Sequence, residues 1–338
     1  MKLSAARARE YLSRRISPSE SYEDLMTFPR FLEIETVNAC NARCPMCTIE
    51  DWQRHTPTMK DDLFSKIADE VIAHRDVVKR VSLYRDGEPL LDKKMPDRIA
   101  YLKDGGIATT TLSTNVSLLD EEKSRRLLEA GLDMIILSID SLQKDVFELI
   151  RRRLKFEEVL ANAHRFIELR NRLRPETTIF MRMIRQEANI DEWPGYEAYW
   201  RPHLAAHDRL YYHNIFNWGG QLEGFRPIAR SYEPGLPCVA LWSLMVIFGD
   251  GRVPLCNVDY NDQYPTGNVA EQSISEIWRS KIMAARRRAH LDGRKGNINI
   301  CANCNVWDES ETVADPVSPD YGGKPLMPDV AAGQGPMI

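Results

Sequence analysis

The sequence contains no long apolar segment. Across all 338 residues, no stretch approaches the roughly 18–20 apolar residues that a helix needs to cross a bilayer. The basic first residues, MKLSAARAREYLSRR, also lack the apolar centre of a secretory signal peptide. We therefore expect a cytoplasmic protein that has no membrane partner.

The sequence also lacks a strong excess of charge of either sign. Its 45 basic and 49 acidic residues are well mixed and leave a formal net charge of -4. Such a chain has no global field that would draw it to nucleic acid or to an anionic surface. The arginine-rich segment 285–294 (ARRRAHLDGR) is interpreted as a solvated helix face, so we expect no nucleic-acid partner.

Cysteine is missing from the whole middle of the chain, because none lies between Cys47 and Cys238. Thiols used as small core hydrophobes would be scattered more evenly. Since cytoplasmic thiols stay reduced, clustered cysteines indicate metal binding or catalysis rather than disulfides. The seven cysteines form a group of three and a group of four: Cys40, Cys44 and Cys47, then Cys238, Cys256, Cys301 and Cys304.

The first group has the spacing C-x3-C-x2-C in the segment NACNARCPMC. Three thiolates leave one coordination position open, which one iron of a cubane cluster can offer to an outside ligand. A zinc ion with three cysteine ligands would recruit a nearby histidine, and the nearest, His55, lies eight residues after Cys47. The second group supplies four thiolates, which fit either tetrahedral zinc or a fully ligated iron–sulfur cluster.

Strand and helix patterns alternate up to about residue 215. Because such strands are parallel and joined by right-handed crossovers, six units predict an α/β fold, a partial (β/α)6 TIM-like barrel. Apolar periodicity predicts strands at 31–37, 79–84, 107–112, 133–139, 177–184 and 209–215. It predicts helices near 60–76, 94–104, 120–129, 143–151, 156–171 and 191–200.

Four notable segments follow the ends of successive predicted strands. The cysteine loop follows the first strand, the turn at 87–89 follows the second, and segments 113–115 and 138–140 end the third and fourth. In barrel enzymes the functional site lies at the carboxyl ends of the strands. We therefore expect the site of this protein at that rim.

The pattern changes after residue 220. Residues 241–248 and 252–255 are predicted to form a β-hairpin with cysteines on either side. Residues 312–338 are rich in Pro, Gly and Asp and lack periodicity. The expected parts are an N-terminal helical extension at 1–25, a barrel at 26–220, a small cysteine-containing cap at 230–310 and a flexible tail at 311–338.

The cysteine loop, its place after the first strand and the repeat pattern resemble the radical S-adenosylmethionine (SAM) enzymes. The resemblance covers most of the chain. It implies that Cys40, Cys44 and Cys47 bind a 4Fe–4S cluster whose fourth iron is chelated by the amine and carboxylate of SAM. It also implies reductive cleavage of SAM to a 5′-deoxyadenosyl radical, which abstracts hydrogen from an unactivated C–H bond.

Further positions of the family pattern imply contacts with SAM. The segment 86–89 (DGEP) resembles the GGE motif that meets the methionine amine, although its first residue is aspartate rather than glycine. Ser138 matches a ribose contact, and Arg151 matches an arginine that pairs with the SAM carboxylate. Met46 stands where an aromatic residue usually packs on adenine. The implied SAM-binding residues are Met46, Gly87, Glu88, Ser113, Asn115, Ser138 and Arg151.

The four C-terminal cysteines resemble the auxiliary-cluster cap called SPASM, or its shorter form, twitch. Residues 251–256 (GRVPLC) match the G-x4-C signature of that cap. A full SPASM cap uses seven cysteines for two clusters. The four cysteines here imply one auxiliary 4Fe–4S cluster, ligated by Cys238, Cys256, Cys301 and Cys304.

The resemblance implies an oxidoreductase that removes two electrons from a small molecule, for example an alcohol of a sugar or aminocyclitol in a biosynthetic pathway. The auxiliary cluster would accept one electron from the substrate, and a flavodoxin or ferredoxin would supply electrons for SAM cleavage. Only about 30 residues precede the first strand, which favours a small molecule over a peptide. The candidate substrate contacts at strand ends are Tyr84, Arg182 and Asn214.

Other functions stay open from the sequence. A radical epimerase usually needs a thiol that returns a hydrogen atom, and no cysteine is left for this if all seven bind iron. Tyr84, Tyr211 or Tyr212 would then replace the thiol. The remaining alternatives are a peptide maturase, an electron carrier without catalysis and a zinc-stabilised binding module.

Overall fold

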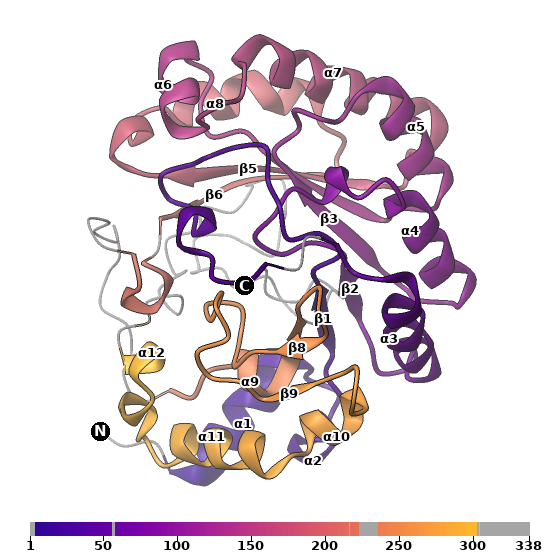
Figure 1. Cartoon of the computed structure of the whole chain (residues 1–338). Helices are drawn as coiled ribbons and strands as arrows, with labels where there is room; N and C mark the ends of the chain where they lie inside the picture. The colour runs from indigo at the N-terminus through magenta and orange to yellow at the C-terminus, as the bar shows by residue number, and fades with distance from the viewer. Residues whose placement is uncertain (1–3, 56–57, 216, 223–235, 303, 305–338) are drawn as a thin grey trace.

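The computed structural model describes residues 4–55, 58–215, 217–222, 236–302 and 304. Its core is one parallel sheet with strand order β6-β5-β4-β3-β2-β1-β7 (Figure 1). All six strands expected from the sequence are present in this sheet, which confirms the partial TIM-like barrel. The strands are β1 (Phe31–Ile34), β2 (Arg80–Ser82), β3 (Thr110–Thr114), β4 (Met134–Ser138), β5 (Thr178–Arg185), β6 (Arg209–Asn214) and β7 (Leu244–Ile247).

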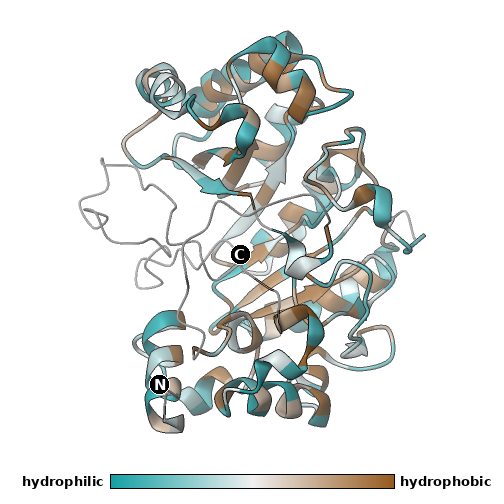
Figure 2. Ribbon diagram, turned by 90° about the vertical axis from the view of Figure 1, so that its left-hand side faces the viewer, coloured by the Kyte–Doolittle hydropathy of each residue, from teal (hydrophilic) through white to brown (hydrophobic). Residues whose placement is uncertain are grey.

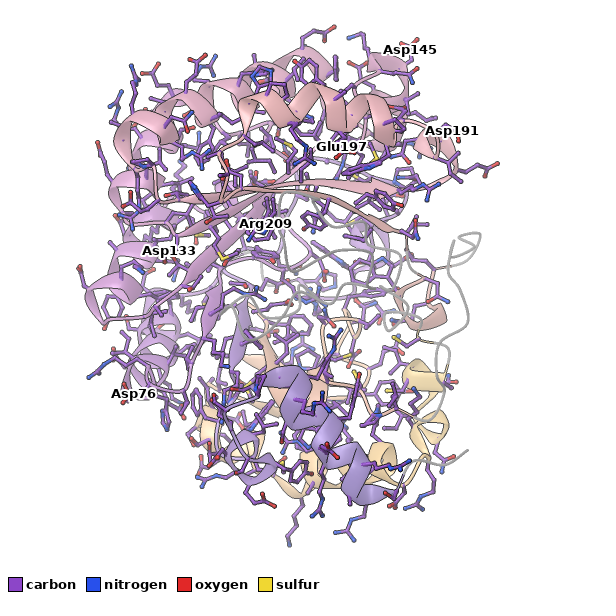
Figure 3. All side chains as sticks on the ribbon, turned by 180° about the vertical axis from the view of Figure 1, so that it is seen from behind. Asp76, Asp133, Asp145, Asp191, Glu197 and Arg209 are labelled. Atoms are coloured by element: carbon purple, nitrogen blue, oxygen red, sulfur yellow. The ribbon has the colours of Figure 1, made fainter. Side chains whose placement is uncertain are left out.

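Helices connect the strands and cover the outer face of the sheet (Figure 1). Their apolar stripes face the sheet, as α3 shows by burying Phe64, Ile67 and Val71. Asp145 and Asp191 are exposed and lie at the periphery (Figure 3), whereas Arg98 and Arg170 are buried. These helices are α3 (Asp61–Ala73), α4 (Met95–Asp104), α5 (Glu121–Glu129), α6 (Lys144–Ile150), α7 (Phe156–Leu173) and α8 (Trp193–Trp200).

Hydrophobic residues lie along the strands of the sheet (Figure 2). β4 (MIILS) is apolar at four of its five positions, as expected for a parallel strand that is covered on both faces. All five residues of β4 are buried. Ile135 and Leu137 pack in the main cluster, while Ile136 packs with Phe180 and Tyr211 in a separate cluster. Because side chains alternate along a strand, the odd-numbered residues of β4 pack in the main cluster and the even-numbered residues face the other side of the sheet.

The predicted β-hairpin at 241–248 and 252–255 is wrong. The first half of this segment is β7, which pairs in parallel with β1 and places Leu244 opposite Phe31. Every residue of β7 is buried, as expected for a parallel strand that is covered on both faces. The second half contains β8 (Arg252–Val253), which pairs antiparallel with β9 (Gly267–Asn268).

The remaining helices gather beside β1 and β7, at the lower end of Figure 1. Trp278 is fully buried there, and its Nε1 donates to the carbonyl oxygen of Leu25 at 3.1 Å. This contact joins the C-terminal part of the chain to the N-terminal helices. The elements are α1 (Ala5–Ile16), α2 (Tyr22–Leu25), α9 (Ala240–Ser243), α10 (Ile274–Trp278), α11 (Lys281–Leu291) and α12 (Asn299–Ala302).

The arginine-rich part of α11 is only partly a solvated face, contrary to the interpretation from the sequence. Arg287 is buried and donates to the carbonyl oxygens of Leu241 and Trp278, both at 2.8 Å. Arg286 donates to the carbonyl oxygens of the loop at 264–265. Two of its arginines therefore hold neighbouring elements in place.

The flexible tail predicted at 311–338 lies outside the described residues. Within the described part of the chain, no helix has the length and apolar character required to cross a membrane.

Candidate active site

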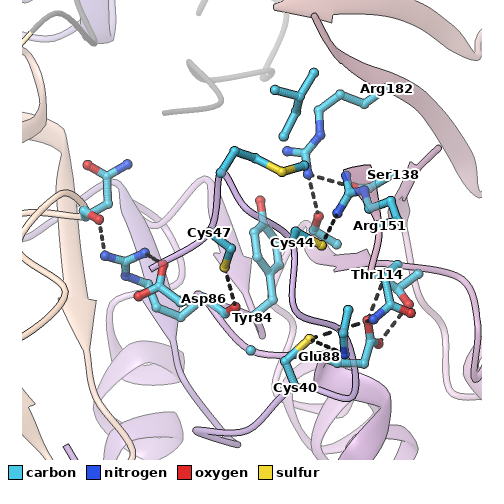
Figure 4. Close-up of a pocket in the computed structure, with 18 of the residues that line it drawn as sticks. Cys40, Cys44, Cys47, Tyr84, Asp86, Glu88, Thr114, Ser138, Arg151 and Arg182 are labelled. Carbon is cyan, nitrogen blue, oxygen red and sulfur yellow. Dashed lines mark hydrogen bonds and ion pairs between the residues drawn. The ribbon is translucent and has the colours of Figure 1, made fainter. Parts of the chain in front are cut away.

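One cavity at the carboxyl ends of the strands collects most of the residues predicted for the site. Its lining contains all three cysteines of the first group and all seven predicted SAM-binding residues. Tyr84 and Arg182 line it as well. Figure 4 shows the cysteine loop facing side chains that follow or end several strands of the sheet. The fold therefore brings together at one rim the features that the sequence placed on separate strand ends.

Each thiol of the first group is approached by a polar group from a different part of the rim. One partner is a side-chain amide, one is a guanidinium group and one is a backbone carbonyl oxygen. These groups fix the cysteine loop against the barrel. The contacts are Cys40 Sγ to Asn115 Nδ2 (3.8 Å), Cys44 Sγ to Arg151 Nη1 (3.9 Å) and Cys47 Sγ to the carbonyl oxygen of Asp86 (3.9 Å).

Burial determines the protonation of these thiols. It raises the pKa of Cys40 to about 11 and that of Cys47 to about 12. It also raises the pKa of Cys44, although Arg151 opposes the shift there. Buried thiols of this kind become thiolates only when a cation replaces the proton. Three soft sulfur donors beside an open cavity fit a 4Fe–4S cluster that has one iron left for another ligand.

The turn after β2 packs directly against the cysteine loop. A Cβ atom on Gly87 would lie 2.6 Å from the carbonyl oxygen of Ala39 and 2.8 Å from that of Val37. The backbone N–H of Glu88 donates to the same oxygen of Ala39 at 2.8 Å. Only glycine allows the two backbones to approach so closely.

The carboxylate of Glu88 is already engaged by the chain. It accepts hydrogen bonds from Thr114 Oγ1 (2.7 Å), from the backbone N–H of Asn115 (2.8 Å) and from that of Leu90 (3.1 Å). Burial raises the pKa of Glu88 to about 7, and these donors oppose the shift. Glu88 therefore fastens the turn after β2 to the end of β3.

The two arginines of the cavity differ in their partners. Arg151 forms a buried ion pair with Asp140, with Nε and Oδ2 2.7 Å apart. Arg182 instead donates through Nη2 to the hydroxyls of Ser138 (2.6 Å) and Ser113 (3.3 Å). Among the residues that the structure describes, no carboxylate forms an ion pair with Arg182, and its buried Nε has no hydrogen-bond partner. Arg182 is thus a cation whose charge is not compensated within this part of the chain.

The structure does not bring Asn214 to the cavity, contrary to its prediction as a substrate contact. Tyr211 and His213 line the cavity instead. Successive side chains of β6 point to opposite faces, and Tyr212 packs on Trp193 of α8. The signal that would have found His213 is this alternation, counted from the inward-facing Tyr211.

Three further cavity residues were missed by sequence reasoning. Glu33 lies on β1, Arg85 directly follows Tyr84, and Trp218 follows β6. Trp218 donates from Nε1 to the carbonyl oxygen of Met46 at 3.1 Å, which joins the wall of the cavity to the cysteine loop. None of the three belongs to a motif, so no local pattern marked them.

The four cysteines of the second group lie around α9, β8 and α12. Burial raises the pKa of Cys238, Cys256 and Cys301, and electrostatic interaction among the thiols adds to each shift. Across the described ranges, no three His, Cys, Asp or Glu side chains are arranged around a single metal ion. A 4Fe–4S cluster binds one thiolate at each iron, so its ligands need not converge on one point.

Comparisons with known proteins decide the family. Residues 34–191 match the model of the radical SAM superfamily, and residues 238–305 match SPASM, described as an iron–sulfur cluster-binding domain. The first match contains the cysteine loop and the strand ends that form the cavity. The chain belongs to the radical SAM superfamily.

Curated relatives of this radical SAM chain differ in how much of their length is shared. GTP 3′,8-cyclase of Chlorobaculum tepidum is 32% identical over 191 residues, and these cover 54% of this chain and 56% of that protein. The chain thus matches only about half the length of this relative. The S-adenosyl-L-methionine-dependent 2-deoxy-scyllo-inosamine dehydrogenase of Niallia circulans is 24% identical over 276 residues, 81% of this chain and 92% of that protein.

Solved radical SAM structures share the fold. BtrN in complex with AdoMet and 2-DOIA has a TM-score of 0.57 and 21% identity, over 82% of this chain and 93% of that one. SuiB of Streptococcus suis has a TM-score of 0.62 and 14% identity, over 78% and 68% of the two chains. At these identities the similarity shows the architecture.

Membership in the radical SAM superfamily confirms the cofactors expected from the sequence, which are SAM and iron–sulfur clusters. The residues present fit these groups, because three thiols share a cavity with polar strand ends and four more thiols lie in the SPASM match.

Proposed function

We propose that this radical SAM enzyme oxidises an alcohol group of a small polar molecule, such as a sugar or an aminocyclitol, to a carbonyl group. The observation that carries the proposal is Arg182, a guanidinium group in the cysteine-lined cavity that is held by two hydroxyls. The relative from Niallia circulans, which is named as a dehydrogenase of an inosamine, aligns over most of both chains and supports this choice.

We further propose which residues hold the cofactors. Cys40, Cys44 and Cys47 would ligate the cluster that binds SAM, and the seven cavity residues predicted from the sequence would contact SAM itself. The cap cysteines would ligate one auxiliary cluster. With three cysteines in the cavity and four in the SPASM match, no thiol is left to return a hydrogen atom, which favours oxidation over epimerisation.

When bound, SAM and the clusters would provide the chemistry that removes a hydrogen atom from the carbon bearing the hydroxyl and then one further electron. The hydroxyl proton must also leave, and here the residues of the chain act. A hydrogen bond from Arg182 would stabilise negative charge on the oxygen as this proton departs. Because Arg182 has no carboxylate partner among the described residues, its charge is available to that oxygen.

His213 would accept the hydroxyl proton. It lines the same cavity, and burial together with Arg182 lowers its pKa to about 4, so the ring is neutral near pH 7. Its Nδ1 lies 3.3 Å from the carbonyl oxygen of Asn214, to which a neutral ring protonated at Nδ1 would donate. A neutral imidazole with this tautomer is suited to general-base chemistry.

Product analysis tests the proposal. The cluster-loaded enzyme is incubated with SAM, a reductant and 2-deoxy-scyllo-inosamine or related sugars and aminocyclitols in deuterated water. We expect a carbonyl product and 5′-deoxyadenosine, with no stable solvent deuterium on the oxidised carbon. Stable deuterium on that carbon in a stereoinverted alcohol would instead identify an epimerase.

Substitution of Arg182 tests its role separately from SAM binding. We expect Arg182→Met to lower kcat/KM by about 100-fold or more, because a donor at a developing oxyanion is lost. Arg182→Lys should recover part of this loss, and both variants should bind SAM with affinity close to that of the wild type. Loss of SAM binding in Arg182→Met would show that Arg182 pairs with the SAM carboxylate instead.

A further inference from the structure

Two cations lie beside the four cap cysteines. Lys295 has only 6% of its surface exposed, and its Nζ donates to the carbonyl oxygen of Leu236 at 3.2 Å, two residues before Cys238. Lys295 also begins the short helical turn Lys295–Asn297, which packs against α12, the helix that contains Cys301. The ammonium group is therefore fixed by the fold on the inner side of the cap.

The two cations reach different members of the cysteine group. Lys295 interacts electrostatically with the thiols of Cys238, Cys301 and Cys304, and this attraction opposes the effect of burial, which lowers its pKa. Arg286 interacts electrostatically with the thiols of Cys256 and Cys301. Together, the two side chains cover all four thiols.

Other ionisable groups near this site do not cancel both cations. Asp259 is fully buried and carries the opposing charge, and its carboxylate accepts hydrogen bonds from three backbone N–H groups. His290 accepts at Nδ1 from the backbone N–H of Cys238 at 3.1 Å. A ring nitrogen that accepts a hydrogen bond carries no proton, so the imidazole of His290 adds no charge in this arrangement. Asp262 also interacts electrostatically with Arg286, and Arg85, which is paired with Asp86, interacts with the thiol of Cys256. The two carboxylates therefore offset Arg286, whereas Lys295 interacts electrostatically with the thiols.

We propose that Lys295, assisted by Arg286, raises the reduction potential of the iron–sulfur cluster held by the four cap cysteines. A cluster with four thiolate ligands carries net negative charge, and reduction adds to it. A buried cation stabilises the reduced form more than the oxidised form, and the effect of Lys295 is weakly screened because its side chain is buried. The inference rests on the proposed auxiliary cluster and assigns to these residues a role beyond holding the cap together.

Redox titration of the whole cluster-loaded enzyme tests the inference. The electron paramagnetic resonance signal of each reduced cluster is followed against potential, and the cluster whose signal changes on addition of SAM is set aside. For the other cluster, we expect Lys295→Met to lower the equilibrium constant for one-electron reduction about tenfold, a shift of about 59 mV to more negative potential.

Two variants serve as controls. Lys295→Arg retains the charge and should keep the potential near that of the wild type. Lys281→Met removes an exposed charge at the start of α11 and should leave the potential unchanged. An unchanged potential in Lys295→Met, or an equal shift in Lys281→Met or Lys295→Arg, would overturn the inference.

A second position covers the case in which Lys295→Met does not load its cluster. Arg286→Gln keeps part of the hydrogen bonding to the 264–265 loop and should also shift the potential to more negative values. If Arg286→Gln loads its cluster and shows the wild-type potential, the inference is overturned. A sample that oxidises no alcohol would count against the proposed function, whereas the potentials would still decide the role of Lys295.

Discussion

At the scale of single residues, Gly87 is the position of the site that we expect to tolerate a side chain least. Its missing side chain is what lets the turn after β2 lie against the backbone of Val37 and Ala39. We expect Gly87→Ala to displace the cysteine loop and to lower both iron content and SAM affinity, by about tenfold or more for SAM. Iron analysis and equilibrium binding measure both effects.

Gly195→Ala is the matched control for this change. Gly195 lies in α8, and a Cβ atom there would have no neighbour within 4 Å. This variant should keep the iron content and SAM affinity of the wild type. Equal losses in the two variants would show that the close approach at Gly87 is not the cause.

Glu33 gives a pH dependence whose direction can be stated. Burial raises the pKa of this cavity residue to about 7, above its usual value of 4.5, although Arg85 opposes the shift. Between these pH values the unfolded chain loses the Glu33 proton while the folded chain retains it. The contribution of Glu33 to stability is therefore complete below about pH 4.5 and is lost as the pH rises through about 7.

We expect Glu33→Gln to remove this dependence. Between pH 5.5 and pH 8, the free energy of unfolding of the wild type should decrease by about 1–3 kcal/mol more than that of Glu33→Gln. Urea titrations of the cluster-loaded chain measure the difference. Glu187→Gln, at an exposed position, should follow the wild-type curve, and a Glu33→Gln curve parallel to the wild type would contradict the assignment.

At the scale of elements, a buried ion pair ties β1 to the segment that follows the cysteine loop. Arg54 Nη1 lies 2.5 Å from Glu35 Oε2, and Arg54 Nη2 lies 2.8 Å from Glu35 Oε1. The Cζ atom of Arg54 lies 3.7 Å from the ring centroid of Phe248. Its Nε also donates to the carbonyl oxygen of Tyr260 at 2.6 Å. Removing one partner leaves the other charge buried without compensation.

We expect Arg54→Met to destabilise the folded chain by about 3–5 kcal/mol, measured by urea denaturation. Arg14→Met is the control, because the ion pair between Arg14 and Glu10 is exposed on α1 and exposed pairs contribute little. A loss below about 1 kcal/mol in Arg54→Met, comparable to an exposed pair, would contradict this account of the pair.

The sequence predicted elements well wherever local periodicity defines them. All six expected strands of the barrel are present because each lies in a short segment with strand periodicity next to a turn or an amphipathic helix. β7 was missed as a barrel strand because its parallel pairing with β1 joins segments more than 200 residues apart. Nothing in residues 244–247 alone distinguishes a strand of this sheet from one arm of a hairpin.

The site could be predicted where motifs mark it and not where only packing does. Cys40 and Glu88 belong to recognisable patterns, and the structure places both in the cavity. His213 and Trp218 carry no motif, and only the face of β6 and the path of the chain after it bring them there. Among the described residues, Arg182 on β5 donates to hydroxyls on β3 and β4 and has no carboxylate partner, and this arrangement of three strands was not visible in the sequence.

At the scale of the whole molecule, the two cysteine groups are joined through buried polar contacts. Arg85 forms an ion pair with Asp86, and the backbone carbonyl oxygen of Asp86 accepts from the thiol of Cys47. The guanidinium group of Arg85 also donates to the carbonyl oxygen of Asn257, the residue after Cys256. The barrel rim and the SPASM match are therefore connected at the residues that would hold the two clusters. The proposed chemistry requires the two groups of cysteines to bind separate clusters with separate roles.

The most direct test of that claim combines an iron count with SAM cleavage. The anaerobically reconstituted wild type should contain roughly eight irons per chain and form 5′-deoxyadenosine from SAM under dithionite. The Cys40→Ala, Cys44→Ala, Cys47→Ala triple variant should retain roughly four irons and form none. A triple variant that still cleaved SAM, or a wild type that bound zinc and no iron, would contradict the account.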